Sequence, residues 1–181
     1  LLSEGLELFR AVGIPTPEFR LVKTPSEAVA AWEALGGPVA LKVNRPHLSH
    51  KTDRGAVRLD VRGEDAIQQA FAQLQEAAGR KDVEILVQAM APKGLEVILG
   101  GKQDAVFGPV VVFGLGGVLV EAVGDAVWRV APVGREEAAR MMGRIRGRSL
   151  LNGFRGEPPR DVQAVQDLLV KISRLMAEHP D

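Results

Sequence analysis

The sequence predicts a mixed α+β (α/β) fold built from two lobes, each containing a sheet and helices. Segments with apolar residues at helical spacing alternate along the chain with short apolar segments typical of strands. The 20 glycines and 11 prolines are spread over 181 residues without a low-complexity tract, so they mark ordered turns between elements. A chain of this length can form one domain with a substantial core or two small lobes.

The first elements follow from periodicity and from helix-end signals. Leu2 to Val12 has apolar residues at helical spacing and stops at a glycine. A proline-containing connector leads to a predicted strand from Phe19 to Lys23. The sequence Thr24-Pro25-Ser26-Glu27 opens a helix that ends at Gly36-Gly37, because proline fits the first turn and an acidic residue complements the helix dipole there. The apolar run from Pro38 to Val43 predicts a short buried strand.

The next elements complete the pattern. Gly55 to Val61 alternates and fits a half-buried strand, Gly63 to Gly79 fits an amphipathic helix, and Glu84 to Met90 fits a strand. The remaining predicted elements are strands at 95–99, 109–113, 118–121 and 125–130, and helices at 135–145 and 161–178.

The two lobes are predicted to meet near Ala89 to Gly94, where the QAMAPKG segment joins two strand-rich halves. We therefore expect an N-terminal lobe at 1–88 and a C-terminal lobe at 89–181. Ligand sites favour such junctions.

Composition excludes several classes of protein. Lys+Arg and Asp+Glu both number 23, so no basic excess indicates a nucleic-acid or acidic-membrane partner. Cysteine is absent, which excludes a disulfide framework and a thiolate metal site. No apolar run reaches the roughly 18 residues of a membrane span, and no signal peptide is visible. We expect a soluble cytoplasmic protein.

The most informative segment is LKVNRPHLSHKTDRG, at Leu41 to Gly55. It is a cationic, turn-rich loop that directly follows a strand, a common place for phosphate chemistry. Lys42 can be an ordinary strand-end lysine that extends to solvent, or its compact ammonium can contact a di- or triphosphate. The glycine allows backbone amides to approach an anion closely, although it also fits a plain turn.

His50 is the candidate nucleophile in this segment. A neutral imidazole attacks phosphoryl groups and titrates near neutral pH, whereas the ordinary alternative is an exposed loop histidine. Lys51 can neutralise a transferring phosphate, and Asp53 can orient the ring through its other nitrogen. The three residues therefore form the predicted catalytic set.

Eight segments now carry a family resemblance. In order along the chain they are GIPTP, LGGPVALKV, HKTDRG, EILVQAM, GLEVILGG, FGPVVVFGLGG, VLVEAVGDAVWRVAP and LLNGFRGEPP. Together they resemble the ATP-grasp domain of ADP-forming acyl-CoA synthetases, a family related to the β subunit of succinyl-CoA synthetase. The resemblance covers residues 1–178 and implies an ATP-grasp fold that binds ATP or ADP with Mg²⁺.

The resemblance also implies roles for individual residues. Lys42 corresponds to the nucleotide-phosphate lysine, and His50 to a histidine of the phosphoryl relay. The resemblance places Arg54 and Gly55 in a glycine-containing phosphate loop. It places Gln88, Ala89 and Met90 at the strand end next to the adenine edge. Glu96 is the acid that follows this strand. Backbone contacts are expected at the adenine edge, with an ordinary core strand as the alternative.

The magnesium site is the least complete part of the prediction. Glu121 and Asp125 are candidate ligands, although acidic pairs at this spacing usually lie on a solvated face. In the resembling family the main Mg²⁺ ligands lie on two later strands, which this chain lacks before Asp181. We therefore expect C-terminal strands outside this sequence.

The resemblance implies an acid–thiol ligase that interconverts acyl-CoA, ADP and phosphate with acid, CoA and ATP through a phosphohistidine. Its partners would be CoA-binding and ligase-like domains or a subunit of the same enzyme, which bind the small acid and CoA. The fragment alone should then be inactive.

One alternative is a regulatory synthetase-like domain of a protein lysine acetyltransferase. Another is an ATP-grasp ligase that forms amide bonds, against which the HKTD segment argues. The acyl group and the base preference are not readable from the sequence.

Overall fold

The computed structural model describes residues 1–45, 55–80, 82–117, 124–154 and 156–179. The elements are α1 (Leu2–Ala11), β1 (Phe19–Val22), α2 (Pro25–Leu35), β2 (Val39–Val43), β3 (Val57–Val61), α3 (Glu64–Ala78), β4 (Ile85–Ala89), β5 (Val97–Asp104), β6 (Gly108–Leu115), β7 (Ala126–Val130), α5 (Arg135–Arg144), α6 (Arg148–Leu151) and α7 (Val162–Glu178). They form two compact units, Leu1–Pro92 and Lys93–Asp181, which we call the first and second unit. The mixed α and β architecture predicted from the sequence is confirmed.

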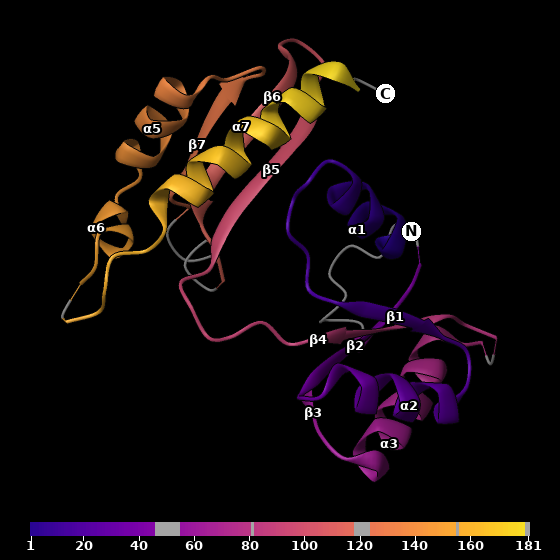
Figure 1. Cartoon of the computed structure of the whole chain (residues 1–181). Coiled ribbons are helices and arrows are strands. Elements are labelled where there is room, and N and C mark those ends of the chain that lie inside the picture. The colour runs from indigo at the N-terminus through magenta and orange to yellow at the C-terminus, as the bar shows by residue number, and fades with distance from the viewer. Residues whose placement is uncertain (46–54, 81, 118–123, 155, 180–181) are drawn as a thin grey trace. The chain divides into compact units, whose positions relative to one another are not determined.

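The first unit contains a four-stranded antiparallel sheet in the order β1-β4-β2-β3. Helices α2 and α3 cover one face of this sheet (Figure 1). Alternate strand residues such as Leu41 and Val87 are fully buried against Phe71 and Leu74 of α3. The opposite face of the sheet carries the side chains of the alternate positions, including Lys42.

The start of α2 follows the sequence signals closely. Thr24 is the N-cap, its hydroxyl accepts a hydrogen bond from Glu27 N at 3.2 Å, and Glu27 reaches back to the backbone. This reciprocal capping box satisfies N–H groups that the first helical turn leaves unpaired. The helix ends at Gly36, whose φ of 70° lies in the left-handed region that favours glycine.

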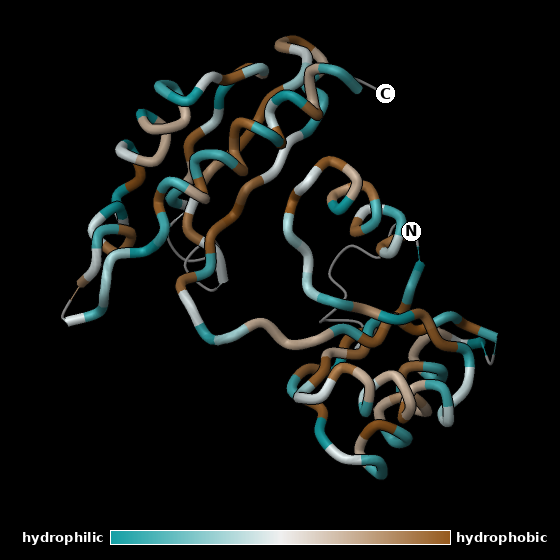
Figure 2. The backbone as a smooth tube through the Cα atoms, in the orientation of Figure 1, coloured by the Kyte–Doolittle hydropathy of each residue, from teal (hydrophilic) through white to brown (hydrophobic). Residues whose placement is uncertain are grey.

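The second unit contains a three-stranded antiparallel sheet in the order β5-β6-β7. Helix α7 packs along β5 and β6, and α5 packs beside it (Figure 1). The core contains Phe113 and Leu169, both fully buried. In Figure 2 the strands of this sheet are mostly brown, whereas the helices alternate teal and brown, as expected of amphipathic elements that cover a sheet.

Two of the predicted strands are longer than expected. The strand predicted at 95–99 is β5, which continues through Gly100 and Gly101 to Asp104, and the strand predicted at 109–113 is β6. The predicted strand at 118–121 lies outside the described residues. None of the described helices has the length and apolar character needed to span a membrane.

Candidate functional site

Lys42 lies within β2, where its neighbours Leu41 and Val43 are buried in the hydrophobic core of the first unit. Because side chains alternate along a strand, Lys42 points to the opposite face of the sheet. Its ammonium group donates a hydrogen bond to Gln88 Oε1 at 2.7 Å, in a partly buried setting. The side chain of Gln88 therefore helps to hold in place the lysine that is predicted to contact phosphate.

The sheet register explains this contact. Lys42 pairs with Leu86 and Ala40 pairs with Gln88, so Lys42 and Gln88 are diagonal neighbours on the same face. Gln88 is 6% exposed. The sequence predicted only a backbone role for Gln88. The structure adds a side-chain role that depends on the pairing of two strands far apart in sequence.

The backbone at the end of β4 is also engaged. Ala89 N donates to Glu18 O at 2.9 Å, and Met90 N donates to Pro38 O at 3.1 Å. Both backbone donors are thus occupied in the first unit.

Of the cationic segment at 41–55, the structure describes residues 41–45 and Gly55. Gly55 has a φ of 66°, in the left-handed region, and its carbonyl accepts a hydrogen bond from Arg58 Nη1 at 2.8 Å. This conformation suits a turn that leads into β3. The predicted residues His50, Lys51, Asp53 and Arg54 lie outside the described residues.

Asn44, which the sequence reasoning did not single out, lies directly after β2 and is 4% exposed. Its amide nitrogen donates to Ser3 Oγ at 3.1 Å and to Glu84 Oε2 at 2.7 Å, and its Oδ1 accepts from Ser3 N at 3.2 Å. We call these three residues the Asn44 cluster. They come from three separate parts of the chain, so sequence spacing gave no signal for them.

Glu96, in the second unit, lies against a glycine turn. Its carbonyl accepts a hydrogen bond from Gly116 N at 2.7 Å. Gly117 has a φ of 60°, and a Cβ added there would lie 2.8 Å from Glu96 Oε2. Gly117 therefore allows close approach to the exposed Glu96 carboxylate, and Gly116 allows close approach to the Glu96 backbone.

Asp125 is largely committed to the backbone. Its Oδ1 accepts from Arg146 N and its Oδ2 from Gly147 N, both at 2.8 Å, and the residue is 8% exposed. These bonds fix the turn between α5 and α6. Glu121, the other predicted magnesium ligand, lies outside the described residues. Among the residues that the structure describes, no group of three or more His, Cys, Asp or Glu is arranged to hold a metal ion.

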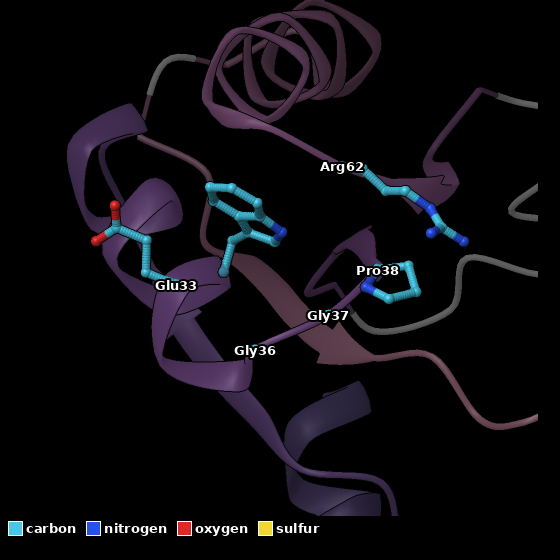
Figure 3. Close-up of a pocket in the computed structure, with 6 residues that line it drawn as sticks. Glu33, Gly36, Gly37, Pro38 and Arg62 are labelled. Carbon is cyan, nitrogen blue, oxygen red and sulfur yellow. The ribbon is translucent and has the colours of Figure 1, made fainter.

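A surface pocket of about 400 Å³ lies elsewhere in the first unit (Figure 3). It is lined by Trp32, Glu33, Gly36, Gly37, Pro38 and Arg62. Figure 3 shows Arg62 and Glu33 at opposite sides of it, and Arg62 already pairs with Asp60. Of the predicted site residues that the structure describes, none lines this pocket.

The chain belongs to the ATP-grasp domain family, whose model matches residues 2–181. Curated relatives define a narrower group within it. The chain is 40% identical over 99% of its length to acetate–CoA ligase (ADP-forming) I of Archaeoglobus fulgidus. It is 36% identical over 98% of its length to the β subunit of acetate–CoA ligase (ADP-forming) I of Pyrococcus furiosus. It spans 27% of the first relative and 79% of the second.

Solved structures agree with this grouping. The acetyl-coenzyme A synthetase 1 of Ca. Korarchaeum cryptofilum is 38% identical, with a TM-score of 0.89 over 98% of this chain and 80% of that chain. A second structure of that enzyme holds coenzyme A and Mg-AMPPCP, with a phosphohistidine segment that points towards the nucleotide binding site. It gives a TM-score of 0.82 at 37% identity, covering 98% of this chain and 78% of that one. The resemblance inferred from the sequence is thereby confirmed.

Proposed function

We propose that this chain is the nucleotide-binding part of an ADP-forming acyl-CoA synthetase. The whole enzyme would convert acyl-CoA, ADP and phosphate into acid, CoA and ATP, and would also run in reverse. Relatives of this activity match almost the whole chain, but the chain spans only 27% of a single-chain relative. The CoA-binding and ligase-like parts would therefore be supplied by other domains or by another subunit.

The position of Lys42 is the observation that carries the proposal. Its ammonium lies on the sheet face opposite α2 and α3, and Gln88 holds it in place through a bond of 2.7 Å. A fixed cation on a strand is suited to stabilise the charge of a nucleotide phosphate, because a positioned group needs little reorganisation when the ligand binds. Nucleotide binding by this chain is supported by the relative that holds Mg-AMPPCP.

The proposal assigns the chemistry to the segment before β3. A phosphoryl group would pass from a phosphohistidine segment of the companion part to ADP, with His50 taking part in the relay. Lys51 would neutralise charge on the transferred group, and Asp53 would orient the imidazole. Arg54 and Gly55 would contact the phosphates. Backbone groups at 88–90 and the Glu96 carboxylate would contact the nucleoside.

Magnesium accompanies the nucleotide in a relative. Among the described residues no group of three or more acidic or histidine side chains is arranged to hold such an ion, and both oxygens of Asp125 already accept a backbone hydrogen bond. The residues of this chain bind and orient the nucleotide and the transferred phosphoryl group.

Calorimetric titration with Mg-ADP and Mg-ATP tests the proposal. It should use the purified chain and the longest natural polypeptide that contains it. Lys42→Met keeps an unbranched side chain but removes the charge, so affinity should fall about 10- to 100-fold, the equivalent of one charged hydrogen bond. Lys23→Ala, an exposed lysine of the same unit, is the matched control and should bind normally.

Two results would overturn the proposal. One is the absence of nucleotide binding by the longest natural polypeptide. The other is unchanged affinity in Lys42→Met. ATP formation from acetyl-CoA, ADP and phosphate by that polypeptide, lost in His50→Ala, would support the complete reaction.

A further inference from the structure

The Asn44 cluster is a buried polar group at the end of the strand that carries Lys42. Ser3 belongs to α1, Asn44 follows β2, and Glu84 precedes β4. Ser3 and Asn44 are each 4% exposed. Both N–H groups of the Asn44 amide and its oxygen have partners. Since a buried polar group without a partner costs about 1–3 kcal/mol, the three residues stabilise one another only as a set.

Asn44 also completes the start of α1. The N–H groups in the first turn of a helix have no acceptor within the helix. Ser3 N finds one in Asn44 Oδ1, at a separation of 41 residues. Helix α1 is therefore capped by the residue at which the chain leaves β2.

The other end of α1 is fastened near Gln88. Arg10 Nε donates to Thr16 Oγ1 at 2.7 Å, and the Arg10 guanidinium lies 4.6 Å from the centroid of the Phe19 ring. Phe19 pairs with Gln88 across β1 and β4. Helix α1 therefore contacts the sheet at two places. One is Asn44, which follows the strand that carries Lys42, and the other is Phe19, which pairs with Gln88.

Asn44 lies one position beyond Val43, at the end of the β2–β4 pairing. Its backbone N–H donates to Glu84 O at 2.9 Å, which extends the β2–β4 pairing beyond Val43 and Ile85. Strand ends open most easily, and an error of about 1 Å in the position of a functional group can cost about 100-fold in rate. Position 44 lies two residues after Lys42 and directly follows the same strand, so the contacts of Asn44 act close to that lysine.

We propose that Asn44 is a positioning residue for nucleotide phosphate binding and phosphoryl transfer, and that it acts through Ser3 and Glu84 to make α1 a support of the site. The inference rests on the proposed function, because it takes Lys42 to be the phosphate-binding lysine. Asn44 itself contacts neither phosphate nor base in this scheme. It holds the strand end in the geometry in which Lys42 meets Gln88.

Exchanging the amide of Asn44 and the carboxylate of Glu84 tests this inference, in the longest natural polypeptide that contains the chain. Asn44→Asp places two carboxylates where Asn44 now donates to Glu84, so the cluster should open. Combining it with Glu84→Gln restores the contact, because the new amide can donate and the Ser3 hydroxyl can turn to donate. Asn44→Asp should weaken Mg-ADP binding and lower kcat by about 10-fold or more, and the double variant should recover most of both.

Thr24→Ala is the matched control for lost stability. It removes a helix cap from α2 in the same unit, on the other face of the sheet, and should cost about 1 kcal/mol without changing nucleotide affinity. Should Asn44→Asp fail to fold, Ser3→Ala removes one partner more gently and permits the same comparison.

The inference is overturned if Asn44→Asp and Ser3→Ala lower Tm, as Thr24→Ala does, while the Kd for Mg-ADP and kcat stay at the wild-type values. It is also overturned if Glu84→Gln does not rescue Asn44→Asp. Absence of Mg-ADP binding by the wild-type protein would instead contradict the proposed function, so the two failures are distinguishable.

Discussion

Asp125→Ala should destabilise the second unit strongly, whether or not magnesium is present. The carboxylate accepts one backbone hydrogen bond on each oxygen, from Arg146 and Gly147, at 2.8 Å. Removing it leaves two partly buried N–H groups without acceptors, at about 1–3 kcal/mol each. The expected loss is about 2–5 kcal/mol in the free energy of unfolding, which lowers Tm by roughly 10 °C for a chain of this size.

Thermal unfolding followed by circular dichroism, in buffer with a metal chelator, measures this loss. Asp161→Ala is the graded control, because Asp161 caps α7 through one exposed bond to Ala164 N and should cost only about 1 kcal/mol. The reasoning is refuted if Asp125→Ala melts like the wild type without magnesium and differs from it only when Mg-ADP is added. That result would support Asp125 as a metal ligand.

Three further outcomes are expected. Gly116→Ala should cost about 1–3 kcal/mol by urea unfolding, because a Cβ there would lie 2.9 Å from the backbone of Glu96. Gly143→Ala should stabilise by about 0.5–1 kcal/mol in the same assay, since that helical position has open space. Hydrogen bonding from Arg129 holds the pKa of Glu137 below its usual value. Stability from this group is therefore present above the unfolded-state pKa and lost as pH falls through the lower folded-state pKa. The Tm of Glu137→Gln should accordingly fall less steeply than the wild-type Tm on acidification below about pH 4.3.

The elements that could be predicted are those whose signals lie within a few residues of one another. The proline and acidic residue after Thr24 predicted the start of α2, and the apolar run before Lys42 predicted β2. In both, local chemistry and tertiary packing favour the same structure, so reading the pattern was sufficient.

β5 shows where local signals mislead. Gly100 and Gly101 read as the end of a strand, yet β5 continues through both because it pairs with β6 along its whole length. Gly101 is needed for packing, since a Cβ there would lie 2.4 Å from Met176 Cγ of α7. Glycine is needed at position 101 because of a methionine that lies 75 residues later in the sequence, on α7. A pattern of neighbouring residues cannot predict this contact.

The same reason explains what the sequence missed in the candidate site. The residue type of Lys42 suggested a phosphate contact, but its partner Gln88 depends on the register of two strands, and a one-residue slip would point Gln88 into the other face. Asn44 in isolation is an amide after a strand, a common turn residue. Only the fold places it between Ser3 and Glu84. Residues that hold a functional group in position are therefore harder to find from one sequence than the group itself, because their partners are set by tertiary pairing and not by spacing.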